Sequence, residues 1–171
     1  MNKNSLVKKD SMENDHSSFW NTAHSFGHII VDTREQKPLW CHEGPKVIKM
    51  KLDEGDYTTT KLYGLAHAER KSGSDLYGSI IGEHKRFKKE IERAAASNIS
   101  LAIFVECPRE AFFRKRFYGG FMLKTPTATL RKIVSTMEDK YNIDFFFNAD
   151  RHEMRENILM WFDWQMQLVG K

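Results

Sequence analysis

Cysteine is scarce in this sequence: the 171 residues include only Cys41 and Cys107. The two lie in different segments and form no CxxC pair, so we expect neither a disulfide framework nor a structural zinc site. This scarcity favours a reducing, intracellular compartment. Long apolar runs are also absent, and residues 2–5 are polar with no long apolar stretch behind them. We therefore expect neither a membrane span nor a secretory signal, and no membrane partner.

The composition is that of an ordinary globular protein with a modest basic excess. Hydrophobic residues make up 40% and charged residues 29% of the chain, and the formal net charge is +4. This charge favours a polyanionic partner, with a solvated basic surface as the alternative. Residues 1–25 are polar and predict a flexible arm, although Phe19 and Trp20 within it can pack on the domain. One folded domain is expected over residues 26–171.

Alternating or continuous apolar runs predict the strands. Residues 48–52 place three apolar side chains on one face, which indicates a half-buried strand. Residues 101–105 are apolar throughout, as in a strand covered on both faces. Tyr63 and Gly64 are expected to form the turn of a hairpin. The six predicted strands are residues 28–31, 48–52, 57–62, 65–70, 101–105 and 143–147.

Three segments have the apolar spacing of helices. The first runs from Asp75, its expected N-cap, to about Ser97. The second is opened by Thr125 and Pro126. The third begins at Asp150, which forms a capping-box pattern with Glu153, and ends near Leu168. Because strands and helices alternate in the second half, we predict an α/β fold with a central mixed β-sheet flanked by α-helices.

Two acids and a lysine lie on neighbouring predicted strands. Asp56 follows the turn at Gly55 and Glu69 lies on the adjoining strand, so their side chains can meet. Residues two apart on a strand point to the same face, which puts Lys71 beside Glu69. Clustered carboxylates bind Mg²⁺ or Mn²⁺, which activates water and neutralises charge in phosphodiester hydrolysis. The structural alternatives are a turn role for Asp56 and an ordinary ion pair between Glu69 and Lys71.

The surrounding motifs make this pattern more specific. They are, in order, Val31-Asp32-Thr33-Arg34-Glu35, Leu52-Asp53-Glu54-Gly55-Asp56-Tyr57, Glu69-Arg70-Lys71-Ser72, Asp75-Leu76, Arg86-Phe87 and Glu90. Their order and spacing resemble the XPF family of structure-specific endonuclease domains, within the PD-(D/E)xK nuclease superfamily. The resemblance covers roughly residues 28–147. It implies a restriction-endonuclease-like fold.

The resemblance also implies roles for individual positions. The implied catalytic residues are Asp32, Asp56, Glu69 and Lys71. The implied ligands of Mg²⁺ or Mn²⁺ are Asp56, Glu69, Asp32 at the edge of the site, and the Arg70 main-chain carbonyl. The residues implied to support the site or face phosphate are Arg34, Glu35, Arg70 and Asp75. A surface ion pair between Arg34 and Glu35, and a plain helix cap at Asp75, are the alternatives.

Two basic segments are candidate DNA contacts. The first is the basic side of the helix that carries Arg86, for which a solvated helix face is the alternative. The second contains Arg114, Lys115 and Arg116 and continues into aromatic residues and glycines. Such a composition grips phosphates and stacks on bases, with a solvated loop as the alternative.

The last predicted helix is apolar nearly all round, which indicates a second surface to bury. The expected core-facing residues are Met154, Ile158, Trp161, Phe162 and Leu168. The apolar residues expected elsewhere around the axis are Leu159, Met160, Trp164 and Met166. The resembled domains pair as dimers, so we expect a homodimer, with cover by the N-terminal arm as the alternative.

The leading hypothesis is a metal-dependent endonuclease that cuts DNA at branched, flap or fork structures. Many members of the resembled family carry a helix-hairpin-helix module or a helicase as well, and this sequence leaves no room for either. We therefore expect a stand-alone form, as in a cytoplasmic bacterial, archaeal or phage protein, that depends on dimerisation or a protein partner for targeting. The alternatives are a non-catalytic DNA-binding or scaffolding module, against which the retained acids argue, and a structural dimerisation domain, which leaves the acids unexplained.

Overall fold

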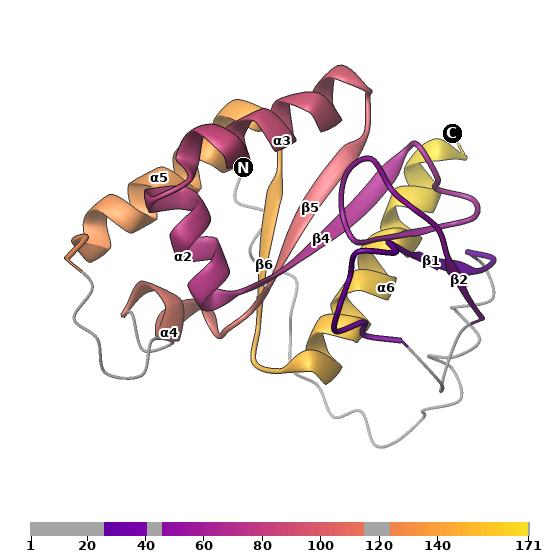
Figure 1. The fold of residues 1–171 in the computed structure, drawn as a ribbon, viewed down its shortest axis with the longest axis horizontal. Helices are drawn as coiled ribbons and strands as arrows, with labels where there is room; N and C mark the ends of the chain where they lie inside the picture. Colours follow the sequence, from indigo (N-terminus) through magenta and orange to yellow (C-terminus); the bar gives the residue numbers. More distant parts are fainter. Residues whose placement is uncertain (1–25, 41–45, 115–123, 171) are drawn as a thin grey trace.

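The computed structural model describes residues 26–40, 46–114 and 124–170, so the predicted arm at residues 1–25 lies outside the described residues. Its centre is a six-stranded sheet in the order β2-β1-β3-β4-β5-β6 (Figure 1). The strands are β1 (Ile29–Val31), β2 (Val47–Lys49), β3 (Tyr57–Thr59), β4 (Ala66–Ser72), β5 (Ser100–Glu106) and β6 (Asp144–Asn148). The helices are α2 (Gly73–Ile81), α3 (His84–Ala96), α4 (Arg109–Phe113), α5 (Thr127–Tyr141) and α6 (Arg151–Val169).

The sheet is mixed, which confirms the predicted fold class. β1 pairs with β2 in parallel and with β3 antiparallel, and β3 pairs antiparallel with β4. β4, β5 and β6 are parallel, so their carboxyl ends meet at one edge, where Glu106 pairs with both Ser72 and Asn148. Tyr57 of β3 lies opposite Ala68 of β4, which brings the residues next to them, Asp56 and Glu69, close together.

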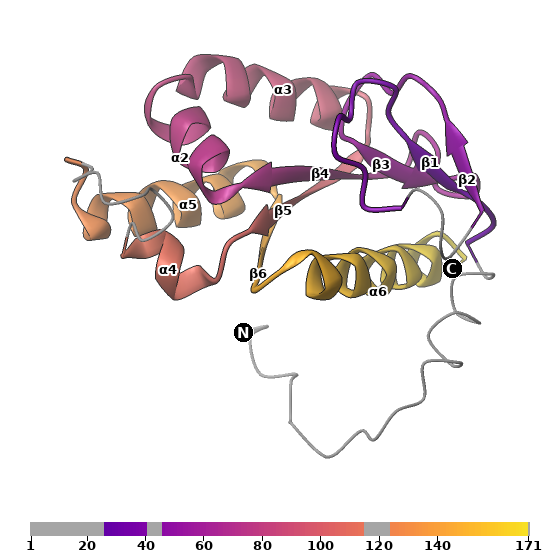
Figure 2. The ribbon, with the colours of Figure 1, turned by 60° about the horizontal axis from the view of Figure 1, so that its bottom comes forward.

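Helices cover both faces of the sheet, and Figure 2 shows α3 and α6 on opposite sides of it. β5 contributes side chains to both hydrophobic cores, because successive residues of a strand point to opposite faces of the sheet. Ala102 and Phe104 belong to the core shared with α6, whereas Leu101, Ile103 and Val105 belong to the core shared with α2, α3, α4 and α5. The prediction of a strand covered on both faces is confirmed.

The predicted helix over residues 75–97 is two helices that run in different directions (Figure 1). The break follows Ile81, where the N–H groups of Gly82 and Glu83 both donate to the Gly78 carbonyl. The apolar periodicity continues across the break, because buried residues of both helices face the same core, and so it hides the break in the sequence. The N-cap is Ser72, whose hydroxyl accepts the Asp75 N–H at 3.1 Å, so the prediction of Asp75 as the cap is wrong.

The first predicted strands are shorter in the structure than in the sequence pattern. β2 lies at the edge of the sheet and ends at Lys49, and Ile48 is 38% exposed although the pattern places it on a half-buried face. An edge strand has a neighbour on one side only, so its apolar alternation does not guarantee burial. The hairpin turn is also longer than residues 63–64, since it spans residues 60–65.

The last helix keeps its predicted limits but not all of its predicted core face. Asp150 is the N-cap and accepts the His152 and Glu153 N–H groups at 2.8 and 2.9 Å, as the capping pattern predicts. Leu168 is 48% exposed and Leu159 is buried, the reverse of the prediction. The sequence pattern also missed α4, a single short helix after β5.

Two further findings concern the residues that the structure describes. None of the helices there is long and apolar enough to cross a membrane. Cys107 is buried and forms no disulfide, while Cys41 falls outside the described part of the chain.

Candidate active site

Gly55 sets the direction of the first acid of the site. Its φ is +77°, a left-handed conformation that glycine adopts without strain. A Cβ at this position would lie 3.0 Å from the His67 Cβ and 3.2 Å from the Ala68 carbonyl oxygen, so the space is also closed to a side chain. The turn therefore presses against β4 and delivers Asp56 beside that strand, where the Asp56 N–H donates to the Ala68 carbonyl at 2.9 Å.

Asp56, Glu69 and Lys71 meet in one place, as the sequence pattern predicted. The Arg70 N–H donates to Asp56 Oδ2 at 2.9 Å, which fixes that carboxylate against the main chain of β4. Glu69 and Lys71 share one face of β4, and the Lys71 Nζ lies 2.7 Å from Glu69 Oε1. Both side chains are nearly buried, with 13% of Lys71 and 12% of Glu69 exposed. This ion pair is therefore far less hydrated than a surface pair.

Burial and the neighbouring Glu69 carboxylate raise the pKa of Asp56 to about 8. The Arg70 N–H opposes this shift but does not cancel it. Two carboxylates that face each other with little water repel, and one of them holds a proton unless a cation compensates the charge. The single positive charge of Lys71 therefore does not fully compensate the two carboxylates of Asp56 and Glu69.

The Lys71 ammonium is stabilised in its charged form although it is largely buried. Burial alone would lower the pKa of Lys71, but the charges of Glu69, Glu90 and Asp56 and the hydrogen bond to Glu69 outweigh it and raise that pKa. The ammonium also lies 5.1 Å from the centre of the Phe87 ring, at the distance of a cation–π contact. Lys71 is therefore a fixed positive charge at the edge of the carboxylate pair.

The carboxylate pair suits a hard divalent cation. Mg²⁺ binds through one or two carboxylates and keeps several of its waters, so it does not need a closed protein cage. No cluster of three or more His, Cys, Asp or Glu side chains with metal-binding geometry occurs among the described residues. The residues that fit such an ion are thus Asp56 and Glu69, whose mutual repulsion it would relieve. The roles implied for Asp32 and the Arg70 carbonyl as ligands stay predictions.

Asp32 donates its main-chain N–H to the Asp56 carbonyl at 2.8 Å, and its buried carboxylate is occupied by other partners. Its Oδ1 accepts the Arg34 main-chain N–H at 2.6 Å and the Arg34 Nε at 2.8 Å, and its Oδ2 accepts the Leu52 N–H at 2.6 Å. Burial would raise the pKa of Asp32, but the bonds from Arg34 and Leu52 outweigh it and lower that pKa. Asp32 is thus a buried anchor that joins the segment after β1 to the segment after β2. The predicted alternative of an Arg34–Glu35 pair does not form, because each residue bonds elsewhere.

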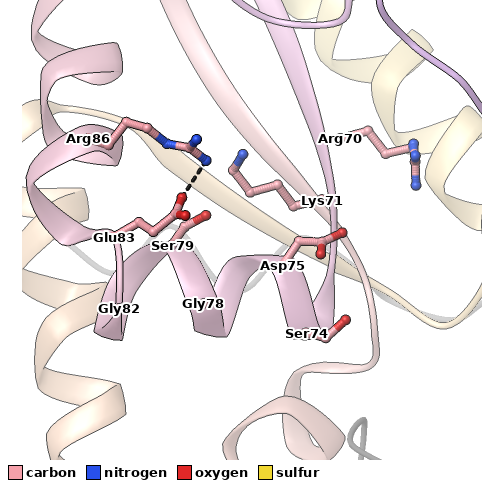
Figure 3. Close-up of a pocket in the computed structure, with 9 residues that line it drawn as sticks. All are labelled: Arg70, Lys71, Ser74, Asp75, Gly78, Ser79, Gly82, Glu83 and Arg86. Carbon is pink, nitrogen blue, oxygen red and sulfur yellow. Dashed lines mark ion pairs between the residues drawn. The ribbon is translucent and has the colours of Figure 1, made fainter.

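Arg70 points away from Lys71, on the opposite side of β4 (Figure 3). Its guanidinium bonds to both oxygens of Glu35, at 3.0 and 3.2 Å, and to Glu106 Oε2 at 3.1 Å. Arg151, at the start of α6, also bonds to Glu106 Oε2 at 3.2 Å and reaches the Lys37 and Pro38 carbonyls. These four alternating charges, the Glu35–Arg70–Glu106–Arg151 network, join both halves of the sheet to α6.

The remaining predicted residues lie on the rim or outside the described chain. Asp75 accepts a hydrogen bond from the Ser72 hydroxyl at 2.7 Å and lines the cleft between Lys71 and Ser74 (Figure 3). Arg86 pairs with Glu83 one turn away on the exposed surface. Arg114 ends α4 and lies 3.6 Å from Glu110. Lys115 and Arg116 fall in the part of the chain that the structure does not describe.

Three adjoining hollows meet at the acid–lysine cluster. The largest, of ≈990 Å³, is lined by Asp56, Glu69, Asp75 and the residues of the charge network. A second, of ≈360 Å³, contains Asp56, Glu69 and Lys71 together with Glu90 of α3. The third, of ≈530 Å³, runs along α2 from Lys71 to Arg86 (Figure 3). The cluster therefore forms the floor of an open, polar cleft rather than an enclosed pocket.

Sequence reasoning missed several charged members of this cleft, among them Glu106 and Arg151 of the charge network. Glu106 directly follows the apolar run of β5, and an acid at the carboxyl end of a buried parallel strand is a signal that was available. Arg151 gave no such signal, because Glu106 lies 45 positions away in the chain and Lys37 lies 114 positions away. Only the packing of α6 against the sheet brings it to the site.

Comparisons with known proteins agree with this geometry. The sequence matches no protein-family model and no curated protein. Among solved structures it is similar to XPF from Aeropyrum pernix, with a TM-score of 0.57 and 21% identity over 84% of this chain and 65% of that chain. A structure of XPF from Aeropyrum pernix in complex with DNA aligns with a TM-score of 0.60 and 21% identity, over 82% of this chain and 65% of that one.

The fold is the α/β fold of the restriction-endonuclease type. More specifically, the fold is that of the XPF nuclease domain, which confirms the resemblance noted from the motifs. At 21% identity the likeness establishes the fold. The chain spans 65% of the length of the solved XPF chains, so activity, substrate and partners are matters for proposal.

Proposed function

We propose that this protein is a Mg²⁺- or Mn²⁺-dependent endonuclease that hydrolyses phosphodiester bonds in DNA, at branched, flap or fork structures. The observation that carries this proposal is the grouping of Asp56, Glu69 and Lys71 on the floor of one open cleft. Phosphodiester hydrolysis needs a hard-cation site next to a group that orients water or stabilises developing charge. These three side chains supply both in an XPF-like fold.

Asp56 and Glu69 would hold the divalent cation, whose part is to polarise the scissile phosphate and lower the pKa of the attacking water. The chain itself does the rest. Asp56 is kept in place by the Arg70 N–H, so its carboxylate needs little reorganisation on binding. Lys71 donates a hydrogen bond to the attacking water or to a phosphate oxygen from its fixed place at the edge of the pair. Asp32 acts indirectly, because it fixes the position of Arg34. The Arg34 charge interacts electrostatically with both Asp56 and Glu69.

The cationic rim of the cleft supports DNA as the partner. Arg34, Arg86 and Arg93 surround the acid pair, and their side chains are 61%, 80% and 61% exposed. The exposed Arg86–Glu83 pair is weak, so a phosphate can replace Glu83 at small cost. An XPF of the same fold has been solved in complex with DNA. Contacts from Arg114, Lys115 and Arg116 are proposed on their composition alone.

A cleavage panel tests the proposal. The purified chain is incubated with flap, fork, Holliday-junction and linear duplex DNA in Mg²⁺ or Mn²⁺, with a chelator as the blank. We expect cutting near the branch point only with metal present. Glu69→Gln keeps the shape of the side chain but removes its charge, and should reduce the rate by at least about 100-fold. Glu92→Gln, the same change on an exposed residue of α3, should leave the rate unchanged.

The outcomes separate enzyme from scaffold. Cleavage that persists in Glu69→Gln at the wild-type rate would sink the assignment of the site. Binding to branched DNA without metal-stimulated cutting would favour the non-catalytic DNA-binding or scaffolding alternative. Equal cutting of branched and linear DNA would keep the nuclease and remove the proposed preference for branches.

We further propose that two copies pair through an apolar stripe on α6. Met160, Trp164 and Leu168 are spaced one turn apart and are 62%, 44% and 48% exposed, with Val169 beside them at 54%. Stripes of this kind on a soluble protein mark a surface that binds a partner. Sedimentation should find a dimer at micromolar concentration, and Trp164→Glu should shift it to monomer. A wild-type chain that stays monomeric at such concentrations would contradict pairing.

A further inference from the structure

Helix α3 contacts the site through one face that the cleavage chemistry above does not use. Phe87 and Glu90 lie three residues apart on α3, so they project from the same side of the helix. The Phe87 ring is buried, and the Lys71 ammonium lies 5.1 Å from its centre. Glu90 lines the same hollow as Asp56, Glu69 and Lys71. Figure 3 shows Lys71 pointing from β4 toward the side where the neighbouring α3 residue, Arg86, lies.

Glu69 has two tasks that conflict. Its Oε1 is the hydrogen-bond partner of the Lys71 ammonium at 2.7 Å. If Glu69 ligates a cation, part of its charge is withdrawn from Lys71, and the ammonium then faces an added positive charge nearby. A long lysine side chain that loses its hydrogen-bond partner samples many rotamers and loses the position that catalysis needs. A second anchor for Lys71 is therefore required in the loaded site.

Glu90 has the properties of that second anchor. It is half-buried, and its charge is among those that raise the pKa of the Lys71 ammonium. Phe87 presents the face of its ring to the same ammonium, and its own position is fixed by the core that it shares with Leu76 and Ile91. Glu90 and Phe87 both lie on a helix, which holds side chains in place more rigidly than a loop does.

We propose that α3 positions the Lys71 side chain. The Phe87 ring contacts the Lys71 ammonium through a cation–π interaction. The Glu90 carboxylate is the counter-charge that holds the ammonium when Glu69 binds the metal. The catalytic role of Lys71 rests on the proposed function, whereas the placement of Lys71 by α3 does not depend on it. Glu90 is not assigned as a ligand, because the described residues contain no group of three acids with metal-binding geometry.

The first test follows the Lys71 side chain itself by NMR, with lysine labelled at Cε and the Lys71→Arg variant to identify its signal. In the wild type the ring current of Phe87 should shift the Lys71 ε-methylene signal upfield, with or without Mg²⁺. In Phe87→Leu the signal should return to the ordinary lysine position. In Glu90→Gln it should be shifted without Mg²⁺, because Glu69 still holds Lys71, and lose the shift when Mg²⁺ is added. Glu92→Gln on the same helix should behave like the wild type.

The second test separates positioning from plain stability by kinetics at saturating Mg²⁺. Glu90→Gln should lower kcat about ten-fold, less than the loss of a direct transition-state donor, with KM for DNA and the affinity for Mg²⁺ unchanged. Phe87→Leu should lower kcat about three- to thirty-fold, the range of a desolvated cation–π contact. Phe87→Tyr keeps a ring and should recover most of that activity. Ile158→Val, a core change of α6 on the other face of the sheet, should lower the melting temperature while leaving kcat intact.

Each result decides between supporting and overturning the inference. An unshifted Lys71 signal in the wild type, or a Glu90→Gln signal that ignores Mg²⁺, would overturn it. A fall in Mg²⁺ affinity in Glu90→Gln would make Glu90 a ligand and replace the inference. A wild-type protein without cleavage would end the proposed function, and the NMR result would still show whether α3 holds Lys71.

Discussion

Asp56→Asn should abolish cleavage and, at the same time, make the metal-free protein more stable above neutral pH. Loss of cleavage by about 1000-fold follows from removing one of two carboxylates that would hold the metal. The gain in stability follows from the repulsion between Asp56 and Glu69, which the amide relieves. The amide oxygen still accepts the Arg70 N–H, so the main-chain contact at 2.9 Å is kept.

The direction of the pH dependence is fixed by the pKa of Asp56, which is 3.8 ordinarily and about 8 in the fold. A raised pKa means that the folded state binds the proton more tightly than the unfolded state. The stability contributed by protonated Asp56 is therefore fully present below about pH 4 and is lost as pH rises through about 8. Wild-type stability in chelator should fall across this window, and that of Asp56→Asn should not.

Thermal unfolding from pH 5 to 9 measures this effect. At pH 8 in chelator, a gain of about 2 kcal/mol, typical for relief of a buried uncompensated charge, would raise the melting temperature by about 4–8 °C. Adding Mg²⁺ should stabilise the wild type and not the variant, because only the wild type binds it. Asp75→Asn, on the exposed rim, serves as the control for a change of net charge. Equal pH profiles for wild type and Asp56→Asn would contradict the proposed repulsion.

Arg70→Met should unfold the protein more readily than any surface change, by about 3 kcal/mol or more. Arg70 is 14% exposed and lies between Glu35, which is 5% exposed, and Glu106. Removing one partner of a buried ion pair leaves the other charge without compensation, which costs about 3–5 kcal/mol. Arg151 still pairs with Glu106, so the loss falls mainly on Glu35.

Urea denaturation of four proteins checks this prediction: wild type, Arg70→Met, Glu35→Gln and the double variant. The double variant should recover part of the loss, because it leaves no unpaired charge. Burial would raise the pKa of Glu35, but the Arg70 bonds outweigh it and lower that pKa below its ordinary 4.5. The stability from the pair is therefore present above about pH 4.5 and is lost as pH falls through the lower folded value. A difference between wild type and Arg70→Met below about 1 kcal/mol at pH 7 would refute a stabilising network.

The sequence alone determined the parts of this protein that rest on local periodicity. The alternation of β5 and the capping residues of α6 are fixed by neighbours in the chain, and they are where the pattern placed them. The same holds for Glu69 and Lys71, since two residues apart on any strand share a face. The meeting of Asp56 with Glu69 was also predictable, because a hairpin brings its two strands together whatever else the fold does.

Only the tertiary structure decided the contacts between distant segments. The break between α2 and α3 left no trace in the apolar pattern, yet it sets the direction from which Phe87 and Glu90 approach Lys71. Asp32 lies in a recognisable motif, but its bonds to Arg34 and Leu52 depend on how the segments after β1 and β2 pack together. Arg70 and Arg151 meet at Glu106 across three elements. Side-chain electrostatics follows such long-range packing, so the sequence names the charged residues while the fold decides which of them face one another.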